Sequence, residues 1–225
     1  MPSAQADPLL MRSRTDGGVS ETRTSQSCHL LKSAGACPAL LRRVHALTGK
    51  PASHMEDPQV ARYEEGQFYG DHYDSVPKEA ARAFADEGGN RLCTVLLYLN
   101  DVERGGETRF SFLGLQVCGG RLGGRLHVGT GALNQTERDG TSPDCRRPPC
   151  SLPPQVSPRK GCALVFFPCF LGGSVDPRTL HQAVPAVKRK YVCQVWVRES
   201  AVPLESGAAA SRIGHRLLEA LHERK

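Results

Sequence analysis

The sequence predicts a mainly β fold, a sandwich or barrel of short strands with flanking helices. Apolar runs of strand length recur at 91–99, 163–170 and 191–197. Turns rich in Gly and Pro join the strand-like runs, which is typical of all-β folds. Apolar residues at helical spacing occur in two places, 37–48 and 211–225. The 225 residues suffice for one domain of ordinary size with tails.

The elements of the first half follow in chain order. Residues 1–22 are rich in Ser, Asp, Gly and Arg, and we expect a disordered tail there. Residues 37–48 place their apolar side chains on one stripe, with a proline near the start and a glycine just past the end, so they predict a helix. Residues 58–74 predict two strands about a turn at Glu65-Gly66.

The second half adds three strands and a tail. Residues 91–99 and 163–170 are nearly continuous apolar runs, so we expect strands that are buried on both faces. Residues 191–197 alternate a polar residue with apolar neighbours, which again favours a strand. Residues 200–225 are expected to form a C-terminal tail, with a helix over 211–225.

One segment inside the predicted domain, which spans 23–199, behaves differently. Residues 118–156 are rich in Gly, Arg, Pro and Thr and show no apolar periodicity. A structureless loop of this length is unusual inside a compact domain. We therefore expect a disordered insertion between two core strands.

Composition excludes several classes of protein. The net charge of +6 is dispersed, and no basic stripe with interleaved aromatic residues appears, so no nucleic-acid partner is expected. No apolar run approaches the ~20 residues of a membrane span. The nine cysteines lack paired spacing, which argues against a disulfide framework or a zinc site. Cys93, Cys162 and Cys193 are predicted to be small core residues.

The compartment stays open at this level. The first 30 residues contain no signal-peptide core, so the chain as given favours the cytoplasm. An N-terminal signal or anchor outside this chain would instead place the protein in the endoplasmic reticulum.

The residues with most chemical content are His72, Asp74, His181 and Lys190. His72 and Asp74 are two apart, so on a strand both point to the same face. A distant histidine, His181, completes a facial triad of two histidines and one carboxylate, which suits Fe(II) and leaves three positions open. The cation of Lys190, on the following strand, is placed to bind the far carboxylate of a 2-oxo acid.

The motifs around these residues form an ordered series. It runs Y-x(5)-Y-x-x-H-x-D, LLYLNDV, GGETRF, KG-x-A-x-x-F, and then a histidine that precedes K-Y. Residues 60–110 and 160–199 thereby resemble the catalytic domain of the prolyl 4-hydroxylase alpha-subunit family. That family belongs to the Fe(II)- and 2-oxoglutarate-dependent dioxygenases. The resemblance implies a double-stranded β-helix, or jelly roll.

The resemblance also implies roles for nine residues. The iron ligands would be His72, Asp74 and His181, and Lys190 would pair with the C5 carboxylate of 2-oxoglutarate, helped by Tyr63 and Thr108. The substrate groove would be lined by Tyr69, Arg91 and Trp196. The reaction implied is hydroxylation of a peptidyl proline at C4 by dioxygen, with release of succinate and carbon dioxide. Ascorbate would restore oxidised iron, and the partner would be a Pro-containing peptide or protein.

Two departures from the family pattern keep alternatives open. The spacing from His181 to Lys190 is one residue shorter than usual, so Arg189 and Lys188 compete with Lys190 as the cosubstrate anchor. Arg198 stands where the family often has His, so the resemblance leaves substrate contact at this position open. The function alternatives are an oxygenase of the same fold acting on another substrate, or a catalytically impaired product because of the insertion and the short N-terminus.

Overall fold

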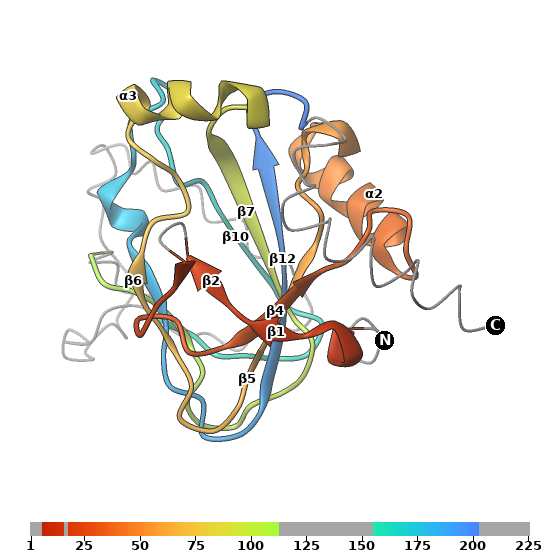
Figure 1. The fold of residues 1–225 in the computed structure, drawn as a ribbon, viewed down its shortest axis with the longest axis vertical. Helices are drawn as coiled ribbons and strands as arrows, with labels where there is room; N and C mark the ends of the chain where they lie inside the picture. Colours follow the sequence, from red (N-terminus) through yellow and green to blue (C-terminus); the bar gives the residue numbers. More distant parts are fainter. Residues whose placement is uncertain (1–5, 16–17, 113–154, 203–225) are drawn as a thin grey trace, which may run out of the picture.

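Two antiparallel β-sheets carry the structure, a computed structural model that describes residues 6–15, 18–112 and 155–202. The larger sheet has the strand order β1 (Met11–Arg12), β4 (Gln26–His29), β5 (Gln59–Tyr63), β12 (Lys190–Arg198), β7 (Arg91–Tyr98) and β10 (Ala163–Phe166). The smaller sheet has the order β6 (Tyr69–His72), β11 (His181–Ala183), β8 (Thr108–Phe110) and β9 (Gln155–Val156). A separate ribbon pairs β2 (Arg14–Thr15) with β3 (Gly18–Val19). This arrangement confirms the predicted mainly β fold (Figure 1).

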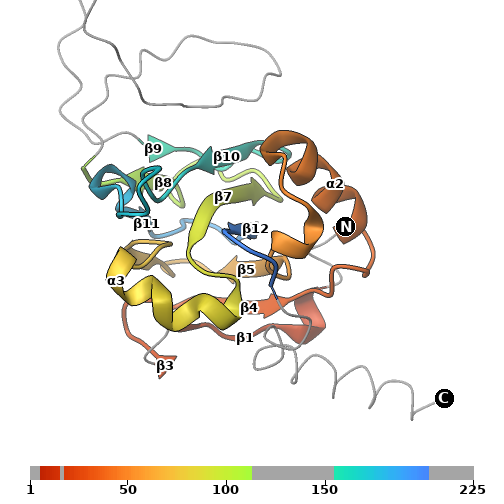
Figure 2. The same ribbon diagram turned by 90° about the horizontal axis from the view of Figure 1, so that it is seen from above.

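The longest described helix, α2 (Cys37–Thr48), covers the larger sheet on the side away from β6 (Figures 1 and 2). It has the predicted bounds, and it ends at Gly49, whose left-handed φ of 70° suits glycine and whose N–H donates to the His45 carbonyl. Leu41 and Val44 are buried against the sheet. The remaining helical pieces are short: η1 (Asp7–Leu9), η2 (Ala52–His54), α3 (Lys78–Ala81), η3 (Arg82–Glu87) and η4 (Pro177–Thr179). Within the described residues, no helix is long and apolar enough to cross a membrane.

The central strand β12 separates two environments. Its residues Cys193, Val195 and Val197 are buried in the apolar clusters that include residues of α2. Lys190, Val192 and Gln194 lie on the opposite face and line a cavity between the sheets. Side chains alternate between the two faces of a strand, so one strand serves both the core and the site.

The N-terminal region differs from the prediction of disorder over 1–22. Residues 6–15 and 18–22 lie in the described part of the chain, and β1 pairs with β4 at the edge of the larger sheet. Ser13 is only 1% exposed, and its hydroxyl bonds to those of Ser25 and Ser27 at 2.9 Å. The residues of β1 are exposed and the buried Ser13 beside it is polar, so this segment has no apolar signature, which is why composition suggested disorder.

Other strand predictions hold with local corrections. The two strands predicted in 58–74 are confirmed as β5 and β6, with Gly66 at a φ of 76° between them. The run 163–170 was expected to be one strand, but β10 ends at Phe166, because Pro168 cannot donate to a β ladder. Cys162 is exposed in the preceding turn, so its assignment to the core is wrong.

The predicted insertion ends before Gln155, two residues earlier than expected. Residues 118–154 lie outside the described residues, as does the helix predicted over 211–225. Gln155 and Val156, the last residues assigned to the insertion, form β9 and pair with Arg109 and Thr108 of β8. The domain strand therefore resumes before the boundary that composition suggested.

Candidate metal and cosubstrate site

Three side chains with metal-ligand atoms meet where β6 and β11 run side by side. His72 ends β6, and the register pairs it with His181, the first residue of β11. Asp74 follows two residues after His72, and its Oδ1 lies 3.6 Å from His72 Nε2 and 3.9 Å from His181 Nε2. The three ligand atoms lie within 4.8 Å of one another. The structure thus brings together the ligand set that the sequence predicts.

The geometry of these side chains fits a metal ion. The Nδ1–H of His72 donates to the Gly70 carbonyl and that of His181 to the Thr179 carbonyl, each at 2.9 Å. These bonds fix the tautomer and leave the Nε2 lone pair of each ring for a metal. Two imidazole nitrogens and one carboxylate form a donor set that suits Fe(II).

The charge states suit a metal as well. Burial lowers the pKa of His72 to about 4, with a further contribution from His181, so this ring is neutral at pH 7. Burial raises the pKa of Asp74, but His181, His72 and Arg91 outweigh it and bring the pKa to about 2. Metal ligands must be deprotonated to bind, and both groups meet that condition at neutral pH.

Stacked rings fix the orientation of the ligand imidazoles. The Tyr69 ring stacks on His72 with centroids 3.6 Å apart and planes 14° apart. The buried guanidinium of Arg23 lies over the same Tyr69 ring, 4.7 Å from its centroid. Phe166 meets His181 edge-on at 4.9 Å. Tyr69 is therefore next to the metal ligands, and its predicted role in lining the substrate groove stays a prediction.

The predicted cosubstrate anchor lies at the other end of the cavity. Lys190 is 1% exposed, its Nζ donates to the Gly106 carbonyl at 2.9 Å, and it lies 4.3 Å from the centroid of the Tyr63 ring. Burial lowers the pKa of Lys190 to about 7, although Glu107 opposes this. The competing residues Lys188 and Arg189 are exposed, and Arg189 pairs with Glu64. Of the three cations, Lys190 is the one that lines the cavity.

One cavity collects seven of the nine predicted site residues. They are Tyr63, Tyr69, His72, Asp74, Thr108, His181 and Lys190. The cavity has hydroxyl and ammonium donors at one end and metal ligands at the other. This arrangement matches a dianionic 2-oxo acid, whose far carboxylate accepts hydrogen bonds from those donors. The arrangement can therefore chelate a metal and bind a second anionic group at a distance from it.

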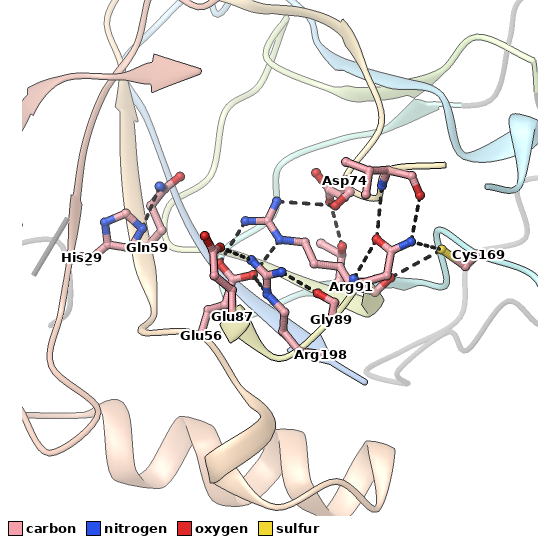
Figure 3. Close-up of polar contacts among 12 residues, drawn as sticks. His29, Glu56, Gln59, Asp74, Glu87, Gly89, Arg91, Cys169 and Arg198 are labelled. Carbon is pink, nitrogen blue, oxygen red and sulfur yellow. Dashed lines mark hydrogen bonds and ion pairs between the residues drawn. The ribbon is translucent and has the colours of Figure 1, made fainter. Parts of the chain in front are cut away.

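Arg91 and Trp196 lie beside this cavity and do not line it. The Arg91 guanidinium lies 3.9 Å from the centroid of the Trp196 ring, and its Nη1 donates to the Asp74 carbonyl at 3.5 Å. Its Nε and Nη2 donate to both carboxylate oxygens of Glu56 at 2.7 and 2.9 Å (Figure 3). Arg198 donates to the same carboxylate at 2.7 Å. These contacts link the backbone of a metal ligand to a partly buried ionic cluster.

Electrostatics explain why Glu56 stays charged in this cluster. Burial raises the pKa of Glu56, but the guanidiniums of Arg91 and Arg198 outweigh burial and lower it. Arg198 also donates to the Gly89 carbonyl at 2.6 Å and lies 3.6 Å from Glu87 (Figure 3). The side chain of Arg198, for which the sequence left substrate contact open, thus binds Glu56, Gly89 and Glu87 within the protein.

Sequence reasoning missed several residues that support the site. Thr94 donates through its hydroxyl to Asp74 Oδ2 at 2.7 Å, and Gln194 lines the cavity. Both lie on the inward-facing positions of β7 and β12, so the period-two pattern contained a signal for them. Glu56 and Arg23 lie outside the named strands and helices and far in sequence from His181, so no local pattern identifies them.

Comparison with known proteins assigns the family. The model of the 2OG-Fe(II) oxygenase superfamily matches residues 58–198, which include the three ligand residues and Lys190. The chain belongs to the 2OG-Fe(II) oxygenase superfamily. Membership implies Fe(II), 2-oxoglutarate and dioxygen, as the sequence predicts, and ascorbate is typical of prolyl hydroxylases.

The chain is also similar to curated proteins that are named as prolyl 4-hydroxylases. The chain is 32% identical over 203 residues to probable prolyl 4-hydroxylase 9 of Arabidopsis thaliana, covering 88% of this chain and 60% of the relative. It is 31% identical over 198 residues to prolyl 4-hydroxylase 1 of the same plant, covering 84% of this chain and 58% of the relative. The predicted resemblance to prolyl 4-hydroxylases is confirmed. The chain spans about three fifths of the length of these two relatives.

Solved structures agree on the fold of this oxygenase. A viral collagen prolyl hydroxylase from Paramecium Bursaria Chlorella virus-1, solved with 2-oxoglutarate, superposes with a TM-score of 0.53 at 20% identity, covering 78% of each chain. A Trichoplax adhaerens prolyl hydroxylase, solved with a hypoxia-inducible-factor peptide, gives 0.52 at 18% identity, covering 93% of this chain and 77% of the other. The predicted jelly-roll fold is therefore confirmed.

Proposed function

We propose that this chain is a 2-oxoglutarate-dependent dioxygenase that hydroxylates a peptidyl proline at C4 and releases succinate and carbon dioxide. One observation carries the proposal: three ligand atoms within 4.8 Å of one another share a cavity with the buried ammonium of Lys190. A structural ion cluster does not require a lysine buried at the far end of the same cavity. A metal-chelated dianion does.

The metal-binding role falls to His72, Asp74 and His181. Bound Fe(II) supplies the oxidative decarboxylation of 2-oxoglutarate by dioxygen. The protein's contribution is to hold both Nε2 atoms ready for the metal through the backbone carbonyls of Gly70 and Thr179. Asp74 and His181 are buried and His72 is partly buried, which strengthens each electrostatic contact at the metal.

The cosubstrate role falls to Lys190, Tyr63 and Thr108. Lys190 and Thr108 are almost fully buried, at 1% and 3% exposure. A charged hydrogen bond in such a dry site is stronger than one in water. The ammonium of Lys190 has three donors, so it can bind a carboxylate while one of them stays on the Gly106 carbonyl, and a bound carboxylate favours its charged form.

The substrate role falls to the side of the cavity where Tyr69, Arg91 and Trp196 lie. Two features support a Pro-containing peptide as substrate. The curated relatives are named as prolyl 4-hydroxylases. Tyr69 is partly exposed and stacks on His72, so a peptide that contacts Tyr69 lies beside the metal ligands, whereas the Trp196 ring is buried under Arg91.

The decisive experiment measures succinate release by the full chain with Fe(II), 2-oxoglutarate and ascorbate. A poly-proline-type peptide is compared with the same peptide carrying Ala in place of Pro. We expect release that depends on proline, and a gain of one oxygen atom on that proline by mass spectrometry. Turnover with a non-peptide substrate alone would reject prolyl hydroxylation and keep the oxygenase. Failure of the folded chain to bind Fe(II) would reject both and favour a catalytically impaired product.

A further inference from the structure

We propose that Tyr98 is a positioning residue that turns the hydroxyl of Thr108 into a fixed donor for the C5 carboxylate of 2-oxoglutarate. The inference rests on the proposed function and deepens it, because it adds to the cosubstrate site a residue that does not touch the cosubstrate. Tyr98 ends β7 and Thr108 begins β8, so the pair also ties the two sheets together.

The geometry of the pair is specific. Tyr98 is fully buried, and its hydroxyl donates to Thr108 Oγ1 at 2.8 Å. A second acceptor, the carbonyl of Val156, lies further away at 3.3 Å. Burial raises the pKa of Tyr98, so this hydroxyl keeps its proton across the physiological range. Tyr98 therefore keeps its proton and donates it to Thr108, the nearer of its two acceptors.

The direction of this bond determines what Thr108 can do. A threonine hydroxyl has one proton and two lone pairs. The oxygen of Thr108 accepts the hydrogen bond from Tyr98. The O–H of Thr108 can therefore donate to another acceptor. Within the described part of the chain, the hydroxyl of Thr108 makes no hydrogen bond other than the one from Tyr98. A buried hydroxyl normally finds an acceptor, so Thr108 needs one from outside these residues.

The surroundings identify the class of that acceptor. Thr108 shares the cavity wall with Lys190 and Tyr63. The ammonium of Lys190 only donates, and it lies over the ring of Tyr63 at 4.3 Å. A corner with an ammonium and an oriented hydroxyl donor fits a carboxylate, whose two oxygens only accept. Without Tyr98, the proton of Thr108 can rotate away from the cavity, and the corner loses one preset donor.

The competing explanation is that Tyr98 merely fills the core, since it packs with Ala61, Leu96 and Val192. The two roles differ in their coupling to Thr108. A positioning role acts only through the hydroxyl of Thr108, so it disappears when that hydroxyl is absent. A packing role persists whatever residue stands at position 108. A double-mutant cycle separates them.

The experiment measures equilibrium binding of 2-oxoglutarate to the full chain loaded with Mn²⁺, a redox-inert substitute for Fe(II), by calorimetry. The variants are Tyr98→Phe, Thr108→Val and the double variant. We expect Tyr98→Phe to weaken binding about fivefold and Thr108→Val about tenfold, the scale of one hydrogen bond to a charged group. The double variant should be no weaker than Thr108→Val alone. Thr108→Ser keeps the hydroxyl, so it should keep both the affinity and the dependence on Tyr98.

Tyr191→Phe is the matched control. Tyr191 lies on β12, and its hydroxyl donates to Asp7 at 2.7 Å on the face away from the cavity. Removing that hydroxyl should leave the affinity for 2-oxoglutarate unchanged. Thermal unfolding and Mn²⁺ binding by each variant report on folding separately. Wild-type affinity in Tyr98→Phe, or additive losses in the double variant, would overturn the inference. No binding by the wild-type chain would instead overturn the proposed function.

Discussion

The two ends of the cavity are built in different ways. At the metal end, each histidine is fixed by a carbonyl two residues earlier in its own segment, Gly70 for His72 and Thr179 for His181. At the cosubstrate end, Tyr63, Thr108 and Lys190 come from β5, β8 and β12, which are far apart along the chain. Their positions depend on strand pairing and on contacts between side chains.

This difference predicts how each end responds to change. Local fixation means that a metal ligand keeps its orientation as long as its own short segment keeps its shape. Non-local fixation means that the cosubstrate end depends on the register of several strands, such as the pairing of Lys190 with Tyr63. We therefore expect substitutions at the metal end to act through metal affinity alone. Substitutions at the cosubstrate end should leave the metal in place.

The largest effect should come from His181→Ala. The substitution removes one of three protein ligands, and we expect loss of measurable Fe(II) binding and of all turnover. Metal binding by calorimetry, and turnover as succinate release, check this. His45→Ala is the matched control, because His45 lies on the exposed side of α2 and, among the described residues, its side chain hydrogen-bonds only to the Lys50 carbonyl. Retained metal binding in His181→Ala would contradict the ligand assignment.

The next effect should come from Lys190→Met, which keeps most of the buried stem and removes the charge. We expect 2-oxoglutarate binding to weaken by about 3 kcal/mol, roughly a hundredfold, because the C5 carboxylate loses a buried charged partner. Metal affinity should not change, which is the test of the contrast between the two ends. Arg189→Met is the control, since Arg189 is exposed and pairs with Glu64. A larger loss in Arg189→Met would transfer the anchor role to that residue.

The same contrast explains how much of the site could be predicted from the sequence. His72 and Asp74 were recognisable because their spacing would place both on one face of a strand, although β6 ends at His72 and Asp74 lies just beyond it. The choice among Lys188, Arg189 and Lys190 was not, because it depends on the register of β12 against β5, and one residue of slip turns a side chain to the opposite face.

The fold shows the same limit. Helix α2 and strands β5, β6, β7 and β12 follow apolar periodicity and were predicted close to their observed bounds. Strands β1 and β9 were not predicted, because each has only two residues. Such a short strand forms through pairing with its neighbour and has no periodicity of its own. Glu56 could not be predicted, because its role depends on hydrogen bonds from Arg91 and Arg198, which lie far from it in the sequence.

A smaller effect should come from Thr94→Val, which removes a side chain that supports the metal end from another strand. Its hydroxyl donates to Asp74 Oδ2 at 2.7 Å, and such outer contacts typically contribute roughly 10–100-fold to metal affinity. We expect weaker Fe(II) binding and, at saturating metal, unchanged affinity for 2-oxoglutarate. Thr48→Val is the control, since that hydroxyl donates to the Val44 carbonyl on α2. A loss of 2-oxoglutarate affinity at saturating Fe(II) would show that the two ends are coupled.

The last effect, the smallest for a change of one pH unit, is a dependence on pH that belongs to the cosubstrate end. Burial lowers the pKa of Lys190 from 10.5 to about 7. Between these values the unfolded chain holds a proton that the native chain has lost, so the free energy of unfolding rises with pH from about 7 to about 10.5. Binding of a carboxylate needs the charged form. Above pH 7 binding therefore takes up a proton, and affinity for 2-oxoglutarate falls by up to about tenfold per pH unit.

Calorimetry of Mn²⁺-loaded protein between about pH 7 and 9, in buffers of different ionisation enthalpy, measures both the affinity and the proton uptake. Lys190→Met should abolish both dependences, because it removes the group that titrates. Its free energy of unfolding should also lose the rise with pH that the wild-type chain shows. A pH dependence that survives in Lys190→Met would assign the titration to the metal end, and the two ends would then share a protonation equilibrium despite their separate construction.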